Sequence, residues 1–332
     1  MRLFVSGMGT VGQGVLEIIT AKMPLLEGKY GDVRIVGVMD SKSYAICDNG
    51  LDVASVLEKK RTERRCGDDG NGLTGPEILA KVDYDTLIEC TPTNIDDGGE
   101  GLKNITSALE NGKDVITVNK GPLALEFCNL MELAKNKGSI MRFEGSVGGA
   151  MPIINLCREG LAGQEIRSIN GIFNGTCNFI LSRMDRGMPF DQALKEAQQL
   201  GYAEADPTYD IKGIDSACKV AILANAVFKR NVTIKDVSIN GIDTITDGAI
   251  ALANDHDMVI RLIGEVSKDK LDVSPRLIPK GHPLSLTGTL NTAVIQTDSA
   301  GPITVSGRGA GRSETASAIL SDLIYILEAR KK

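Results

Sequence analysis

The chain of 332 residues is long enough for two domains that each bury a core of their own. Its 24% charged and 42% hydrophobic residues are typical of a globular protein and exclude a disordered or fibrous chain. The net charge of −6 offers no electrostatic footprint for nucleic acid or an anionic membrane, so neither is expected as a partner. Met1 leads directly into an apolar strand and no apolar run reaches spanning length, so we expect a cytoplasmic protein.

The cysteines and histidines exclude several kinds of chemistry. The seven cysteines are scattered singly, without the close pairs that zinc sites favour, and we expect reduced thiols. Only His256 and His282 are available, and neither lies in a recognisable motif, so a histidine-activated nucleophile is disfavoured. Catalysis is therefore expected to depend on lysines and carboxylates.

Short apolar strands alternate with helical stretches over the first 142 residues. We expect strands at residues 2–6, 34–39, 86–90, 114–117 and 139–142, and helices at residues 11–19, 101–111 and 123–137. Residues 24–32 and the polar residues 61–72 are expected to be loops. This alternation predicts a parallel, doubly wound sheet of the Rossmann type.

The pattern changes after about residue 145, where a second, mixed α/β domain is expected. It contains a helix at residues 152–159, a strand at 168–173 and a helical region at 176–228 with a turn at 201–207. Further strands are expected at residues 238–241, 258–267, 271–278 and around 293–306. A final helix at residues 313–329 begins with Ser313, which can cap its start.

A glycine-rich run lies between the first expected strand and the first expected helix, the context that indicates a dinucleotide-binding site. Its glycines permit a tight turn, close approach of a pyrophosphate and close helix packing, and the helix N-terminus supplies N–H donors. The alternative is a glycine turn without a ligand, which the following strand–helix alternation disfavours. The residues of the run are Gly7, Met8, Gly9, Thr10, Val11 and Gly12.

Asp40 ends the second expected strand, where a carboxylate can accept hydrogen bonds from the adenosine ribose and repel a 2′-phosphate. This position favours NAD over NADP. Its distance from the glycines is longer than usual, however, and Lys42, Lys59 or Lys60 can instead fold back to receive a phosphate. The cofactor is therefore predicted as NAD(P), with NAD favoured.

Two further segments follow expected strands and so belong to the same crevice, since open α/β sheets bind ligands at strand C-termini. Thr91 and Thr93 follow the strand at residues 86–90, and Lys120 follows the strand at residues 114–117. Simple turn chemistry is an equally good reading of the threonines, and a solvated surface lysine is the default for Lys120.

Asp215 and Lys219 are four residues apart, on one face of an expected helix that continues with apolar residues. An exposed ion pair would be expected on a polar face, so that reading is the weaker one. Because burial of a charge pair is costly, its retention at a helix start suggests a lined substrate pocket. A lysine there can act as general acid or base in alcohol–carbonyl chemistry.

These motifs occur in one order over nearly the whole chain, and together they resemble the homoserine dehydrogenase family. They are the glycine run, Thr91-Pro-Thr93, Asn119-Lys120, residues 144–152 (Glu-Gly-Ser-Val-Gly-Gly-Ala-Met-Pro), residues 174–178 (Asn-Gly-Thr-Cys-Asn), the acidic residues 201–219, and residues 307–311 (Gly-Arg-Gly-Ala-Gly).

The resemblance implies reversible, NAD(P)-linked interconversion of L-homoserine and L-aspartate 4-semialdehyde in threonine and methionine biosynthesis. It further implies that Lys219 donates and accepts the proton and that Lys120 is a second active-site lysine near the nicotinamide. Glu204 and Asp215 would hold the ammonium of the substrate, an arrangement consistent with the charges. Gly175 and Thr176 would complete the substrate site.

The resemblance also implies a monovalent cation, sodium, bound by Glu144 and by carbonyls of Val147, Gly149 and Met151. Gly309 and Gly311 would return the C-terminal segment to the cofactor. The expected domains are then a nucleotide-binding domain at residues 1–142, completed by residues 307–332, and a substrate and dimerisation domain at residues 143–306. A homodimer is the family expectation.

Two departures and two alternatives accompany this interpretation. Cys177 stands where the family commonly has threonine, and we expect neither the C-terminal regulatory domain nor the fused aspartate kinase of some relatives. One alternative is a dehydrogenase of similar architecture that acts on another amino acid or semialdehyde. The other is a nucleotide sensor without catalysis, which would have no need of an acid–base lysine.

Overall fold

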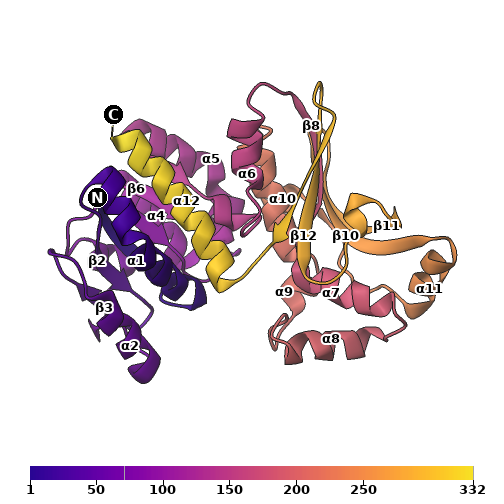
Figure 1. Cartoon of the computed structure of the whole chain (residues 1–332), viewed down its shortest axis with the longest axis horizontal. Helices are drawn as coiled ribbons and strands as arrows, with labels where there is room; N and C mark the ends of the chain where they lie inside the picture. The colour runs from indigo at the N-terminus through magenta and orange to yellow at the C-terminus, as the bar shows by residue number, and fades with distance from the viewer. Residues whose placement is uncertain (71, 332) are drawn as a thin grey trace. The chain divides into compact units, whose positions relative to one another are not determined.

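The structure is a computed structural model that describes residues 1–70 and 72–331 (Figure 1). Residue 71, within the expected loop 61–72, and residue 332, at the end of the C-terminal segment, lie outside the described residues. The chain forms two compact units, Met1–Ser146 with Gly311–Lys332 and Val147–Ala310. Both boundaries lie four residues later than the sequence predicts, at 146/147 instead of 142/143 and at 310/311 instead of 306/307.

The first unit is built on a seven-stranded sheet of order β4-β3-β2-β1-β5-β6-β7. Its five parallel strands are β2 (Arg34–Met39), β1 (Arg2–Ser6), β5 (Thr86–Glu89), β6 (Asp114–Thr117) and β7 (Met141–Arg142). The strands β3 (Ser43–Ile46) and β4 (Asp68–Asp69) add an antiparallel edge that the pattern did not predict. The expected doubly wound α/β architecture is confirmed.

Helices cover the central strands of this sheet. The long helices α1 (Thr10–Tyr30) and α12 (Arg312–Arg330) lie side by side, far apart in sequence, and share one core with β1 (Figure 1). That core includes Val5, Leu16, Ile319 and Leu323, all fully buried. The helices α4 (Gly99–Glu110) and α5 (Lys120–Lys137) pack on one another, and α4 also packs on β5 and β6; α2 (Val53–Glu63) and α3 (Gly75–Leu79) complete the unit.

The predicted loop at residues 24–32 is wrong, because α1 continues through Pro24 to Tyr30. A proline inside a helix removes one hydrogen bond and normally kinks or ends it. Here tertiary packing prevails: Leu26 is fully buried in the core, and the Tyr30 hydroxyl donates to Glu328 Oε1 of α12 at 2.7 Å.

Two smaller predictions in this unit are also corrected. Residues 61–72 are not simply a loop, since they include the end of α2 and the strand β4, and Cys66 is buried with its amide donating to Ser43 Oγ. Ser313 does not cap α12, because the helix begins at Arg312 with Gly311 as its N-cap and has no side-chain cap.

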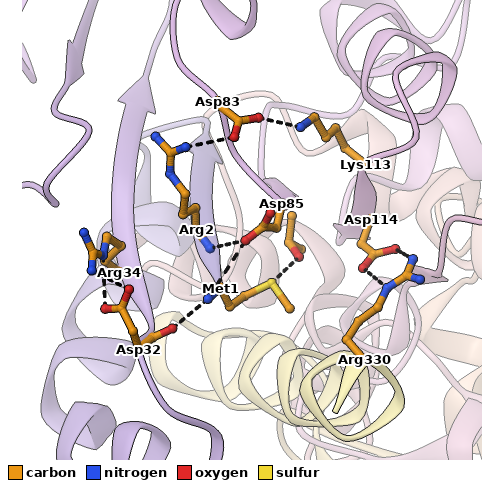
Figure 2. A network of polar contacts seen from close by, with 10 residues as sticks. Met1, Arg2, Asp32, Arg34, Asp83, Asp85, Lys113, Asp114 and Arg330 are labelled. Carbon is orange, nitrogen blue, oxygen red and sulfur yellow. Dashed lines mark hydrogen bonds and ion pairs between the residues drawn. The ribbon is translucent and has the colours of Figure 1, made fainter. Parts of the chain in front are cut away.

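Charged residues join the segments at the strand N-termini of this unit (Figure 2). The Arg2 guanidinium donates to Asp83, which also accepts from Lys113 at 2.8 Å. From α12, Arg330 Nε donates to Asp114 Oδ2 of β6 at 2.9 Å. These contacts connect β1 and α12 to the end of the sheet where the parallel strands begin.

The second unit contains a six-stranded sheet of order β13-β12-β8-β10-β11-β9. Its strands are antiparallel except for the β9–β11 pair. They are β8 (Ile166–Ile172), β9 (Ser238–Ile239), β10 (Met258–Ser267), β11 (Leu271–Pro279), β12 (Leu290–Thr297) and β13 (Pro302–Arg308).

The helical part of this unit is more interrupted than the sequence predicts. It comprises α6 (Ile153–Asn155) with the π-helix Leu156–Gly160, then α7 (Gly175–Met184), α8 (Phe190–Gln199), α9 (Thr208–Ile211), α10 (Ile214–Ala226) and α11 (Asp247–Asp255). Gly213, in a left-handed conformation, separates α9 from α10. α10 packs on β10 and β11 and is buried over almost all of its length, as its apolar sequence predicts. Among the described helices, none combines the length and apolar character needed to cross a bilayer.

Candidate active site

In the first unit the glycine run forms a tight connection from β1 to α1. Gly7 has φ 91°, and a Cβ on it would lie 2.5 Å from the backbone of Cys90. A Cβ on Gly12 would lie 1.9 Å from the Gly7 carbonyl oxygen. Both positions therefore require glycine because neighbouring backbone occupies the space of a side chain.

The start of α1 is open to a ligand. Gly9 is the N-cap and provides no side-chain cap, and a Cβ on Gly9 would have no atom within 4 Å. The first helical hydrogen bond runs from Gln13 N to Gly9 O at 3.1 Å, so the preceding N–H groups have no partner inside the helix. Unbonded donors, a positive helix end and open space beside Gly9 fit the pyrophosphate of a dinucleotide.

Asp40 follows β2 and forms an ion pair with Lys60, one of the lysines considered for a phosphate. Asp40 Oδ1 also accepts from the backbone N–H groups of Lys42 and Ser43, each at 2.8 Å. Burial alone would raise the pKa of Asp40, but the hydrogen bonds from Lys60 and Lys42 hold that pKa below its usual range. A carboxylate and a cation thus stand together after β2.

The strands β5 and β6 end in hydroxyl and amide side chains that contact each other. Asn119 Nδ2 donates to Thr91 Oγ1 at 3.0 Å and to the Pro92 carbonyl at 3.2 Å. Asn119 also caps α5 by accepting from Gly121 N at 3.2 Å. Lys120 is the first residue of α5, earlier than the expected helix start at residue 123. The structure therefore brings the Thr91 segment and the Asn119-Lys120 segment together.

In the second unit, Lys219 and Asp215 form the buried pair expected from their spacing. Lys219 Nζ donates to Asp215 Oδ2 at 2.7 Å and to the Phe173 carbonyl oxygen at 2.6 Å. Both side chains are about nine-tenths buried, at 8% and 10% exposure. Asn291 Nδ2 donates to the same Phe173 carbonyl at 3.0 Å. This bond helps to hold in place the carbonyl oxygen that accepts from Lys219.

A second carboxylate, Asp210, joins this pair through Asn174. Asn174 Nδ2 donates to Asp210 Oδ1 at 2.6 Å and to Asp215 Oδ2 at 3.0 Å, while its Oδ1 caps α7. Burial, and then the nearby Asp215, raise the pKa of the Asp210 carboxyl. The sequence reasoning did not select Asp210 or Asn174. The position of Asn174 between an expected strand and an expected helix was a signal that could have identified it.

The other predicted substrate residues lie in different surroundings. Gly175 opens α7, where a Cβ would lie 2.6 Å from the Thr289 carbonyl, and Thr176 Oγ1 donates to the Tyr202 carbonyl at 2.6 Å. Glu204 is exposed between α8 and α9, and within residues 1–70 and 72–331 its side chain forms no hydrogen bond or ion pair. The structure thus gathers Asp210, Asp215 and Lys219 and leaves Glu204 outside the cluster.

Cys177, the departure from the usual motif, is buried beside this cluster. Its thiol donates to the Asp210 carbonyl at 3.2 Å. Burial, and then the charges of Asp210 and Asp215, raise the pKa of this thiol well above its ordinary value. A thiol that stays protonated is a poor nucleophile, so Cys177 fits packing and hydrogen bonding rather than reactivity.

The residues predicted to hold a cation belong to both units. Glu144 is buried in the first unit, and its amide donates to Asp322 Oδ2 at 2.8 Å. Val147, Gly149 and Met151 belong to the second unit, where a Cβ on Gly149 would lie 2.6 Å from the backbone of Gly309. In the described part of the chain, no group of three or more His, Cys, Asp or Glu side chains could hold a metal ion.

The two glycines near the C-terminus also divide between the units. Gly309 belongs to the second unit, and a Cβ there would lie 1.9 Å from Asn291 Nδ2. Gly311 is the N-cap of α12 in the first unit. Close packing against Asn291 explains why position 309 requires glycine.

An open dinucleotide turn in one unit and a buried lysine among carboxylates in the other define a class of enzyme, the NAD(P)-dependent oxidoreductases that act on a CH–OH group. Two family models match the chain: "Homoserine dehydrogenase, NAD binding domain" over residues 7–144 and "Homoserine dehydrogenase" over residues 152–324. The chain belongs to the homoserine dehydrogenase family.

Individual relatives agree over the whole length. A homoserine dehydrogenase of Methanocaldococcus jannaschii is 45% identical, with all of both chains covered. An NAD(+)-dependent homoserine dehydrogenase of Pseudomonas canavaninivorans is 36% identical over 98% of this chain and 96% of its own length. A crystal structure from Archaeoglobus fulgidus, described as a homoserine dehydrogenase, is 46% identical with a TM-score of 0.91, and covers 98% of this chain and 99% of its own.

Proposed function

We propose that this enzyme interconverts L-homoserine and L-aspartate 4-semialdehyde, with Lys219 as its proton donor and acceptor. The observation that carries the proposal is the buried cluster of Lys219, Asp215, Asn174 and Asp210 in a chain with an open dinucleotide turn. A lysine ammonium has three N–H donors, and Asp215 and the Phe173 carbonyl accept two of them. The third is available to a substrate oxygen.

In this mechanism Lys219 Nζ takes the hydroxyl proton during oxidation of the alcohol and returns it to the carbonyl oxygen during reduction. A dinucleotide held at the turn from Gly7 to Gly12 would supply the hydride-transfer chemistry. Asp215 and the Phe173 carbonyl hold the lysine amine in one orientation, which keeps the proton donor positioned through the reaction. Lys120, at the start of α5, is proposed as the second active-site lysine on the cofactor side.

The substrate ammonium is proposed to be bound by carboxylates of the second unit. Asp210 and Asp215 place two carboxyl groups beside the ammonium of Lys219, and carboxyl groups are suited to bind an ammonium. Glu204 is proposed to contribute from the segment before α9, with Gly175 and Thr176 lining the site at the start of α7. An amino acid with a terminal hydroxyl matches both the carboxylates and the lysine.

For the cofactor, we propose the pyrophosphate at the turn from Gly7 to Gly12, with Thr91, Thr93, Gly309 and Gly311 as further contacts. NAD is proposed as the preferred form because Asp40 has a lowered pKa and remains ionised. The Pseudomonas canavaninivorans relative is named NAD(+)-dependent, whereas an archaeal relative with a TM-score of 0.85 and 30% identity was solved in complex with NADPH. Lys60, beside Asp40, is the cation available to a 2′-phosphate.

Titration with NADH and NADPH, followed by cofactor fluorescence, tests this preference. Tighter NADH binding by the wild type, reversed in Asp40→Asn, supports it, because loss of the carboxylate leaves Lys60 free for a phosphate. Tighter NADPH binding by the wild type contradicts it.

We also propose that sodium is bound through Glu144 and the carbonyls of Val147, Gly149 and Met151, since oxygen donors suit a hard cation. A homodimer through the second unit, a cytoplasmic location and a role in threonine and methionine biosynthesis complete the proposal. The homodimer is proposed from the resemblance to the family. Sedimentation and a sodium titration of thermal stability test the dimer and the cation.

The experiment that tests the central proposal is reduction of NAD⁺ and NADP⁺ at 340 nm with L-homoserine, compared with L-threonine, L-serine and no substrate. Turnover specific to homoserine supports the proposed substrate. Turnover with another substrate would indicate a different dehydrogenase of the same fold. Cofactor binding without any turnover would indicate a nucleotide sensor.

A further inference from the structure

The proposed mechanism leaves one buried acidic side chain of the first unit without a role. Glu89, the last residue of β5, is fully buried. Two other buried carboxylates of this unit, Asp114 and Asp322, each pair with an arginine. Among the described residues no lysine or arginine forms an ion pair with Glu89. An unpaired buried carboxylate is costly, and such groups are concentrated at functional sites.

Hydrogen-bond donors from two segments converge on Glu89. Thr91 donates to Glu89 Oε1 with both its backbone N–H, at 2.7 Å, and its hydroxyl. Asn104 Nδ2 of α4 donates to Glu89 Oε2 at 3.2 Å and to Ser6 Oγ, at the end of β1, at 3.1 Å. Burial raises the pKa of Glu89, and the hydrogen bonds from Thr91 and Asn104 oppose part of that rise.

An asparagine amide sets the direction of the hydroxyl bond. Asn119 Nδ2 donates to Thr91 Oγ1 at 3.0 Å, which leaves the Thr91 hydroxyl hydrogen for Glu89. An ionised carboxylate accepts all three donors, whereas a protonated one would place its own hydrogen against one of them.

Glu89 also lies next to segments that pack on the proposed cofactor turn. Ser6 precedes Gly7, and Gly7 packs on the backbone of Cys90 and Thr91, the two residues after Glu89. Asn104 therefore links Ser6, at the end of β1, to Glu89, at the end of β5. β1 and β5 are adjacent parallel strands, and ligands of open α/β sheets bind outside such strand ends.

We propose that Glu89 is an ionised positioning residue of the cofactor site, and that its negative charge favours the oxidised nicotinamide over the reduced one. NAD⁺ and NADH have the same adenosine and pyrophosphate, and they differ by one positive charge on the ring. A buried anion acts equally on the phosphates of the two forms. Its effect on the ratio of the two affinities therefore reports its interaction with the nicotinamide ring alone. In the reducing direction such a charge assists departure of the hydride, because it stabilises the cofactor that remains.

The test is the variant Glu89→Gln, which removes the charge and keeps the shape. The dissociation constants of NAD⁺ and NADH are measured separately, by calorimetry and by NADH fluorescence, without substrate. We expect NAD⁺ affinity to fall about three- to ten-fold relative to NADH affinity. Asn104→Ala, which removes one donor and the group that orients Ser6, is the second variant and should shift the same ratio in the same direction by less.

Asp114→Asn is the matched control, because it also converts a buried carboxylate of this sheet into an amide, at the opposite end of the strands. It should lower the unfolding temperature and leave the ratio unchanged. Equal loss of both affinities in Glu89→Gln, or no loss, would overturn the role of the charge. The inference rests on the proposed cofactor site, and a wild type that binds neither form would instead remove that site.

Discussion

Two regions of this molecule both contain several charged side chains, and they differ in how those charges are balanced. At the strand N-termini of the first unit, each carboxylate has a cation beside it, and most of these groups are partly exposed (Figure 2). At the start of α10 in the second unit, Asn174 joins the carboxyl groups of Asp210 and Asp215, and the Asp215–Lys219 ion pair is buried.

Under the proposed function, this difference corresponds to one between stability and substrate binding. A locally balanced, solvated network contributes modestly to folding. A buried cluster of carboxylates around an ammonium is costly in the free protein, and the proposed cationic substrate would balance it. Four experiments test this contrast, in order of decreasing expected effect.

The largest effect is expected for Lys219→Ala. Loss of the proton donor and acceptor should lower kcat by two or more orders of magnitude, while the affinity for NADH stays nearly unchanged. Steady-state kinetics and a fluorescence titration measure the two quantities. Lys212→Ala, which removes a solvent-exposed ion pair with Asp243 in the same unit, is the control and should retain activity. Full activity of Lys219→Ala would remove this lysine from the mechanism.

The second prediction concerns pH. Burial, and then the nearby Asp215, raise the folded-state pKa of Asp210 above its ordinary value of 3.8, so the folded protein favours the neutral carboxyl. The penalty for ionising it is absent below that value and grows as pH rises through the folded pKa, so the free energy of unfolding should decline across this window. Asp210→Asn should abolish that part of the decline.

Substrate should act in the opposite direction on the same group. If Asp210 binds an ammonium, homoserine should bind more tightly as pH rises through this pKa, with release of a proton measurable by calorimetry in buffers of different ionisation enthalpy. A binding constant that does not change over this window in the wild type would argue against Asp210 as a ligand of the ammonium.

A smaller effect is expected for Arg330→Ala, in the ion-pair network at the strand N-termini of the first unit. This change removes the partner of Asp114, which is buried, but Arg330 itself is 42% exposed. The free energy of unfolding should fall by about 1 kcal/mol, since charged hydrogen bonds at partly exposed positions are screened by solvent. Cofactor affinity and kcat should be unaffected. A marked loss of cofactor binding would show that this ion-pair network contributes to the cofactor site as well as to stability.

The smallest effect is expected for Lys113→Ala, in the same ion-pair network. Asp83 keeps its contact with Arg2 in this variant, and the Asp83 side chain is 68% exposed. Chemical denaturation should show a change of about 0.5 kcal/mol or less. A several-fold larger loss of unfolding free energy would mean that the ion pairs at the strand N-termini act cooperatively.

The two-domain α/β organisation, the glycine turn and the family follow from local patterns in the sequence. Glycine spacing, the periodicity of the main strands and the four-residue spacing of Asp215 and Lys219 are local properties, and the structure has the turn, these strands and the ion pair at the predicted positions. α10 was also recognisable, because a helix that is apolar almost all round can only be buried.

Features that depend on distant partners follow from the tertiary structure alone. α1 passes through Pro24 because Leu26 and Tyr30 find contacts in the core and on α12, more than 280 residues along the chain. Asp210 meets Asp215 through Asn174, and Glu89 meets Ser6 through Asn104, although no periodicity connects these positions. Local patterns report which backbone conformation and which face a residue prefers. The partners of a buried polar group are set by how the segments pack.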